Sequence, residues 1–164
     1  MVIDISPLTK GKVTEQKIDL TLNSSDFFIG DTDIKITEPV VLNGGLTKLG
    51  DIIHLDIQIT TTLLLICSRC TENFSEIINI DVHEIFSNNP TDEDGYIIFI
   101  NSDVIDITEI VENNLFWALP IKKLCKEDCM GLCQKCGSNL NISTCNCENR
   151  DVDPRLAKLK DLFF

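Results

Sequence analysis

The spacing of the cysteines constrains this chain more than any other feature. Six of the eight cysteines lie in the segment 125–147, and the other two form a pair, Cys67 and Cys70. Disulfide-rich scaffolds are typical of short secreted proteins, but residues 1–5 lack the positive flank and long apolar core of a secretory signal. We therefore expect a reducing, cytoplasmic environment, in which clustered cysteines indicate metal binding.

One four-thiolate zinc site is predicted within the cysteine-rich segment. Cys133 and Cys136 are separated by two residues and followed by Gly137, which can adopt a positive φ without steric cost. This spacing directs two thiolates toward one tetrahedral metal ion. Cys145 and Cys147 can complete the site without a ligand from elsewhere in the chain.

A second zinc site follows from the cysteines that remain, namely Cys67, Cys70, Cys125 and Cys129. It would connect the middle of the chain to its end. In an alternative grouping, Cys125 or Cys129 replaces one of the last two cysteines of the first site, and the Cys67 and Cys70 pair is then free or bound elsewhere. A site closed by four sulfurs is structural, because catalytic zinc keeps a position open for water. The prediction is therefore two structural zinc ions and no catalytic residue.

Composition and charge limit the partners of this chain. The 164 residues include 43% apolar residues, which is enough for one ordinary core, and no apolar run approaches the roughly 20 residues needed to cross a membrane. The net charge of −12 opposes nonspecific attraction to nucleic acid. Between Arg69 and Lys122 the chain has eleven acidic residues and no lysine or arginine, which suggests an acidic face for a basic partner. A small basic patch is expected from Lys122, Lys123, Lys126 and Lys135.

Residues 1–100 alternate apolar and polar residues in a pattern that predicts strands. The fold class is α+β, with an antiparallel β-sheet or partial barrel over residues 1–100. Asn43-Gly44-Gly45 predicts a turn between strands. Residues 96–100 predict a short buried strand.

The clearest predicted strand is Asp51–Ile66, in which every second residue is apolar. Because sixteen residues is long for one strand, a bend or bulge is expected near Thr60–Thr62. Its predicted partner is Phe74–Ile85. The Cys67 and Cys70 pair then lies at the turn between the two strands, where a zinc knuckle commonly forms.

Residues 101–164 predict a helix, the cysteine-rich zinc-knuckle segment and a last helix packed on it. Apolar residues at steps of three and four predict the first helix over Thr108–Leu119, with Thr108 as N-cap and Pro120 ending it. The last helix is expected to begin at Asp153. Trp117, the single tryptophan, is expected to pack in the core or at an interface rather than to stack on bases.

Ordered motifs over roughly residues 50 to 164 resemble those of the YceD family, bacterial and plastid proteins named for the accumulation of large-subunit ribosomal RNA. The matching motifs are Cys67-Ser68-Arg69-Cys70 followed by Phe74; Ile105-Asp106-Ile107; Ala118-Leu119-Pro120; Leu124-Cys125-Lys126-Glu127-Asp128-Cys129; Gly131-Leu132-Cys133; Cys136-Gly137; Asn139-Leu140; and Asp153-Pro154-Arg155-Leu156-Ala157 with Leu159.

The resemblance implies a non-catalytic role in producing or stabilising large-subunit ribosomal RNA. Together with the acidic balance, it favours a precursor of the large ribosomal subunit or a basic ribosomal protein as partner, with local RNA contact through the four lysines. Two alternatives stay open. One is an RNA-processing or thiol-redox enzyme that uses Cys67 and Cys70, and the other is a zinc-dependent regulator that binds DNA.

Overall fold

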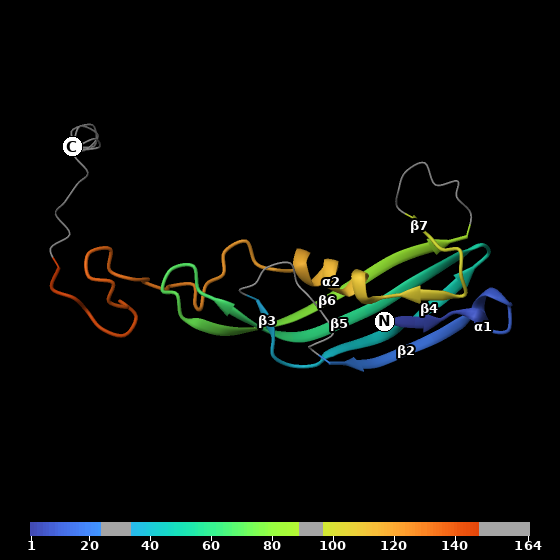
Figure 1. Cartoon of the computed structure of the whole chain (residues 1–164), viewed down its shortest axis with the longest axis horizontal. Coiled ribbons are helices and arrows are strands. Elements are labelled where there is room, and N and C mark those ends of the chain that lie inside the picture. Colours follow the sequence, from blue (N-terminus) through green and yellow to red (C-terminus); the bar gives the residue numbers. More distant parts are fainter. Residues whose placement is uncertain (24–33, 89–96, 148–164) are drawn as a thin grey trace, which may run out of the picture.

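The computed structural model describes residues 1–23, 34–88 and 97–147, which form an elongated molecule (Figure 1). The strands are β1 (Val2–Asp4), β2 (Glu15–Leu22), β3 (Lys35–Ile36), β4 (Val40–Leu49), β5 (Ile52–Ile66), β6 (Asn73–Ser87), β7 (Ile97–Phe99) and β8 (Val104–Asp106), and the helices are α1 (Ser6–Thr9) and α2 (Thr108–Trp117). The cysteine-rich segment extends from one end of the sheet. No helix within these ranges is long and apolar enough to cross a membrane. The predicted helix at Asp153 lies outside the described residues.

The long hairpin of β5 and β6 is the centre of a six-stranded sheet. As predicted, alternate residues of β5 face the core, and Ile53, Leu55, Ile57, Ile59, Leu63 and Leu65 are all buried. Thr61 shares this face, and its hydroxyl donates a hydrogen bond of 3.1 Å to the carbonyl oxygen of Glu38. Of the bend or bulge predicted near Thr60–Thr62, the bulge is wrong, because β5 and β6 pair residue for residue from Ile52 to Ile66.

The predicted turn at Asn43-Gly44-Gly45 is also wrong, because these residues lie inside β4 and pair with both β2 and β5. The glycines are needed for a different reason, which is the close approach of neighbouring strands. A Cβ on Gly44 would overlap the carbonyl oxygen of Asp56. The chain turns instead at Gly50, which has a φ of 65° between β4 and β5.

The sheet is mixed rather than purely antiparallel. Its order is β2-β4-β5-β6-β7, with β3 also paired to β5, and β7 runs parallel to β6. The ends of this order do not pair with each other in the described residues, so the sheet is not a closed barrel, and a partial barrel is not confirmed. Residues 97–99 do form a strand, but the side chains of Ile98 and Phe99 are exposed rather than buried as predicted.

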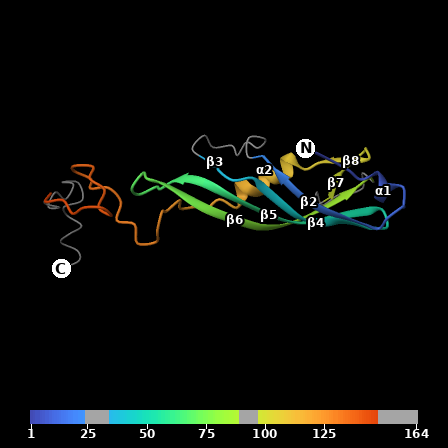
Figure 2. The ribbon, with the colours of Figure 1, turned by 90° about the horizontal axis from the view of Figure 1, so that it is seen from below.

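A second layer covers the buried face of the large sheet and is made of α1, the antiparallel β1–β8 pair and α2 (Figure 2). Val111 and Leu115 of α2 are fully buried in the same core as the inward residues of β5. The helix begins at Thr108, so Thr108 is not the N-cap. The carboxylate of Asp106 accepts a hydrogen bond from the backbone N–H of Thr108 (2.9 Å), which satisfies a donor of the first turn. The helix ends at Trp117, three residues before Pro120.

Candidate metal centres

The eight cysteine sulfurs meet in two groups of four, and within each group all sulfurs lie within 4.8 Å of one another. The first cluster is Cys67, Cys70, Cys125 and Cys129, and the second cluster is Cys133, Cys136, Cys145 and Cys147. This division matches the first of the two groupings considered from the sequence. That the cysteines bind metal stays a prediction, which the geometry of each cluster makes physically reasonable.

The first cluster joins the tip of the β5–β6 hairpin to the segment that follows α2 (Figure 1). The Cys67 and Cys129 sulfurs are 3.8 Å apart, and the Cys70 and Cys125 sulfurs are 3.6 Å apart. A disulfide would require about 2.05 Å, and all eight cysteines are free thiols. Four sulfurs placed tetrahedrally at about 2.3 Å from zinc lie about 3.8 Å from one another. The observed separations therefore suit a tetrahedral ion such as zinc.

Burial distinguishes the two clusters. In the first cluster Cys67, Cys70 and Cys129 are at most 3% exposed and pack with Phe74 and other apolar side chains. In the second cluster only one cysteine is buried, and Cys136 is exposed. The first cluster is thus part of the protein interior, whereas the second lies in a local segment at the surface.

Tight turns present the paired cysteines in both clusters. Between Cys133 and Gly137 a backbone hydrogen bond of 2.9 Å closes the turn, and Gly137 has a φ of 73°, as expected from the sequence. The hairpin tip has a similar bond from Thr71 N–H to the Cys67 carbonyl oxygen (2.9 Å). Thr71 occupies the position after the second cysteine with a φ of 59°, a conformation costly for a β-branched residue.

Acidity differs between the sulfurs of the first cluster. Burial raises the pKa of Cys67, but backbone N–H groups, led by that of Cys125, outweigh it and lower the pKa to about 6. Burial and then the neighbouring sulfurs raise the pKa of Cys125 itself to about 12. Once one thiolate has formed, its neighbours resist deprotonation because like charges this close repel. A divalent cation between the sulfurs would remove that repulsion and bind all four as thiolates.

The second cluster likewise contains one cysteine with a lowered pKa and one with a raised pKa. Hydrogen bonds from the hydroxyl and the backbone N–H of Ser138 hold the pKa of Cys136 at about 6. The hydrogen bond that Cys147 shares with Cys136, followed by burial, raises the pKa of Cys147 to about 12. Both clusters therefore contain a thiol that ionises readily, which is the first requirement of a thiolate ligand.

Two residues that the sequence interpretation did not assign support the first cluster, and one of them comes from the segment of the second cluster. Asn141 lies between Cys136 and Cys145 of the second cluster, yet its side-chain amide donates a hydrogen bond of 3.3 Å to the Cys129 sulfur of the first cluster. The side-chain oxygen of Asn141 accepts a hydrogen bond of 2.9 Å from Met130 N–H. The Arg69 guanidinium donates to the carbonyl oxygen of Cys129 (2.8 Å). Asparagine and arginine are ordinary loop residues, so nothing in their spacing indicated this supporting role.

The contact between the hairpin tip and the segment after Cys129 requires a glycine. Gly131 has a φ of 72°, and a Cβ there would lie 3.0 Å from the carbonyl oxygen of Arg69. That same oxygen accepts a hydrogen bond of 3.2 Å from Leu132 N–H. The backbone of the segment after Cys129 is therefore held directly against the hairpin tip.

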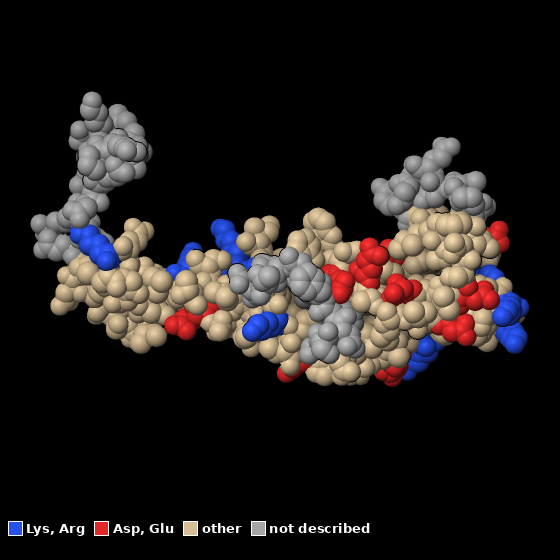
Figure 3. Space-filling view, viewed as in Figure 1, with Lys and Arg blue, Asp and Glu red and all other residues tan. Residues whose placement is uncertain are grey.

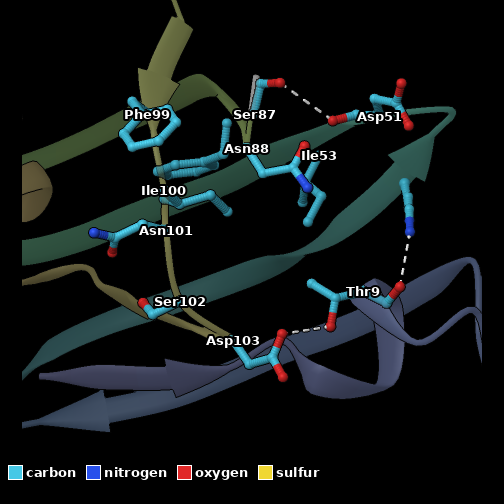
Figure 4. A pocket seen from close by; sticks show the side chains of 12 residues that line it. Thr9, Asp51, Ile53, Ser87, Asn88, Phe99, Ile100, Asn101, Ser102 and Asp103 are labelled. Carbon is cyan, nitrogen blue, oxygen red and sulfur yellow. Dashed lines mark hydrogen bonds between the residues drawn. The ribbon is translucent and has the colours of Figure 1, made fainter. Parts of the chain in front are cut away.

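A separate cavity of about 510 Å³ lies near α1, at a distance from the cysteines (Figure 4). The Lys48 ammonium donates to the carbonyl oxygens of Leu8 and Thr9 (3.0 and 3.1 Å), and the Thr9 hydroxyl donates to Asp103 (2.7 Å). These polar groups are used to hold α1 in place. The described lining residues include no histidine or cysteine, and we assign no chemistry to this cavity.

The fold and the sulfur geometry define a class of protein: a small, mostly antiparallel sheet that carries two four-cysteine clusters able to hold metal ions at one end. Within that class, this chain belongs to the YceD family. The family model described as "Large ribosomal RNA subunit accumulation protein YceD" matches residues 55–163, which confirms the resemblance inferred from the motifs.

Relatives occur in bacteria and in chloroplasts. The chain is 28% identical to the protein YlbN of Bacillus subtilis, over 89% of this chain and 87% of that protein. It is also 28% identical to the chloroplastic "Large ribosomal RNA subunit accumulation protein YCED homolog 1" of maize, over 76% of this chain and 54% of that protein. The chain thus spans about half the length of its maize relative. The Arabidopsis protein of the same name is 25% identical, over 67% and 44% of the two chains. No solved structure matches the chain.

Proposed function

We propose that the protein is a non-catalytic ribosome-biogenesis factor that supports the accumulation or processing of large-subunit ribosomal RNA. It acts by binding a basic ribosomal protein or a precursor of the large subunit, and its eight cysteines hold two structural zinc ions. The observation that carries this proposal is the first cluster. Four inward-facing sulfurs join the hairpin tip to the segment after α2, which gives a scaffold a fixed shape and leaves no coordination position for a substrate.

An acid-rimmed groove supports a basic protein partner. A cavity of about 360 Å³ lies between α2, β6 and β8, with a floor that includes Ile98, Ile100 and Ile110. Glu84 and Glu109 lie at the same cavity, and neither forms an ion pair within the described residues. In Figure 3, acidic side chains gather on the visible face near α2 and β8. A segment with lysines or arginines beside apolar side chains fits both the floor and the charge.

Basic side chains are found toward the cysteine-rich end, where they provide local contact with RNA. The exposed lysines there are Lys122, Lys126 and Lys135. In Figure 3, basic side chains (blue) are visible at this end and also near α1. Phosphate contacts of this kind are sequence-independent and weaken with salt. The opposite charges of the groove and of this end suit a protein that binds a protein and an RNA at different places.

The test compares cells that lack the protein with cells that express tagged variants. Loss of the protein is expected to lower large-subunit ribosomal RNA relative to small-subunit RNA, and the tagged protein is expected to recover a ribosomal protein or precursor in stoichiometric yield. The double variant Glu84→Lys with Glu109→Lys should lose this partner. A matched control reverses charge on the exposed β2 residues Glu15 and Asp19. Normal RNA in cells without the protein, together with no ribosomal material on the tagged chain, would contradict the proposal.

A thiol-redox enzyme that uses Cys67 and Cys70 is the second candidate, and the lowered pKa of Cys67 is the observation in its favour. Against it, Cys67 is only 1% exposed and its sulfur has three sulfur neighbours. The assay is alkylation of the zinc-loaded protein by iodoacetamide at neutral pH. Rapid labelling of Cys67 with retention of zinc would favour the enzyme, and no labelling before zinc is removed would favour the scaffold.

A further inference from the structure

The exposed aromatic pair at the end of α2 is not explained by folding. Trp117 is 82% exposed and Phe116 is 47% exposed. The two rings meet edge to face, with centroids 5.9 Å apart and an angle of 78° between their planes. Trp117 is the single tryptophan of the chain. The sequence predicts it in the core or at an interface; its exposure shows that it does not pack in the core, and packing at an interface stays a prediction. A tryptophan presented in this way marks a binding surface.

The backbone around the aromatic pair is held in place on both sides. The N–H of Ala118, the C-cap of α2, donates to the carbonyl oxygen of Asn114 (3.0 Å), which closes the last turn of the helix. Further along, the carbonyl oxygen of Lys123 accepts a hydrogen bond of 2.7 Å from Ser68 N–H at the hairpin tip. The exposed rings therefore stand on a segment fixed between the helix and the first cluster, so they do not have to be ordered when a ligand binds.

The charge beside the rings indicates which ligand they meet. The exposed Lys122 lies five residues after Trp117 in the sequence, and no acidic residue lies between Trp117 and Lys126. A segment of five residues spans at most about 18 Å, so Lys122 and Trp117 can reach the same short stretch of ligand. A basic protein segment would be repelled here, whereas the phosphates of a nucleic acid would be attracted.

We propose that Trp117, supported by Phe116 and flanked by the exposed Lys122, is a stacking platform for an unpaired base of single-stranded RNA. The tryptophan face carries the base, and the Lys122 ammonium group pairs with a phosphate on an adjoining nucleotide. Single-stranded nucleic acids are held by this combination of aromatic faces and cations, largely independently of sequence. The proposal rests on the proposed role in ribosomal RNA accumulation and adds the surface through which RNA is held.

The test uses the zinc-loaded full chain and a single-stranded RNA of twelve nucleotides with mixed sequence. Because Trp117 is the single tryptophan, its fluorescence reports on this site alone, and stacking should quench it. Heparin is the comparison ligand, since it carries dense negative charge but no bases. We expect RNA to quench the fluorescence strongly and heparin to leave it nearly unchanged.

Variants separate stacking from charge, with binding of end-labelled RNA followed by fluorescence anisotropy. Trp117→Ala should weaken binding roughly 5- to 150-fold, which is the range for the loss of one stacked base, and Trp117→Phe should retain part of the affinity. Replacing Lys122 by Gln should lower the slope of log K against log salt by about 0.7. The control replaces the exposed Lys12, near α1, by Gln and should leave binding unchanged. Circular dichroism confirms that each variant is folded.

Several results would overturn the platform. These are RNA that fails to quench, heparin that quenches equally, Trp117→Ala that binds RNA normally, or a tryptophan signal that responds to a basic ribosomal protein and not to RNA. The last result would make this surface a protein interface. Such a failure differs from failure of the proposed function, because the latter is decided by ribosomal RNA levels in cells that lack the whole protein.

Discussion

Removing one sulfur from each cluster should have unequal consequences, although each removal should release one metal ion. The variants are Cys129→Ser in the first cluster and Cys136→Ser in the second. After dialysis against a mild chelator, both should contain one zinc per chain, compared with two in the unaltered protein. The difference should be seen in the stability of the sheet.

The magnitude follows from what each cluster joins. The first cluster connects Cys70 to Cys125, 55 residues further along the chain. If the metal acts as a cross-link, closing a loop of this length contributes about 4 kcal/mol to the free energy of unfolding. This amount is comparable to a large part of the stability of many domains.

In the second cluster, losing the metal ion should destabilise only the segment around it. Cys136 and Cys145 are nine residues apart, and closing so short a loop contributes about 3 kcal/mol, which stabilises only the segment that contains it. Cys136 is exposed, so its replacement creates no buried polar group.

Amide hydrogen exchange distinguishes these outcomes. We expect Cys129→Ser to accelerate exchange at the paired residues next to the hairpin tip, around Leu65 and Phe74, and to lower the melting temperature. Cys136→Ser should leave those amides unchanged and accelerate exchange only beyond Met130. If Cys136→Ser opens the hairpin as much as Cys129→Ser does, the two clusters are not independent supports and this reasoning is refuted. The same follows if the unaltered protein binds no metal.

Three further results are expected. Gly44→Ala should destabilise the protein by at least about 3 kcal/mol in urea denaturation, because its Cβ would overlap the carbonyl oxygen of Asp56 in the adjacent strand; a loss below 1 kcal/mol would show that the strands can move apart. Asn141→Asp should weaken zinc binding at the first cluster by about 10- to 100-fold in a chelator competition, since a carboxylate would replace the amide that donates to the Cys129 sulfur; Asn141→Ala is the milder control. The hydrogen bond from the amino-terminal ammonium group lowers the pKa of Asp106 to about 2, so its stabilising contribution is present above pH 4 and is lost as the pH falls toward 2; a carboxyl titration by NMR showing an ordinary pKa near 4 would contradict this.

The sequence predicted best where one physical cause governs a pattern. Alternation in β5 reflects burial of one face, and it identified the inward residues of that strand correctly. Dividing eight cysteines into two groups of four also matched the structure, because the paired spacings left few geometric choices. The placement of Cys67 and Cys70 at a hairpin tip followed from the strands on either side.

Predictions failed where one residue type serves two purposes. Gly44 indicated a turn, but the same lack of a Cβ permits the close approach of two strands. Ile98 and Phe99 read as buried because they are apolar, yet they lie in an edge strand that leaves them exposed. Supporting contacts such as that of Asn141 with the Cys129 sulfur depend on the tertiary fold and have no local sequence pattern.

The sulfurs of the first cluster are synthesised at different times. Cys67 and Cys70 leave the peptidyl-transferase centre 55 or more residues before their partners at Cys125 and Cys129. At about 5–20 residues per second this is a delay of roughly 3–11 s. During that interval the hairpin can pair its strands, but its tip has no closing partner. Locking of the hairpin tip can therefore begin only after Cys129 has been synthesised.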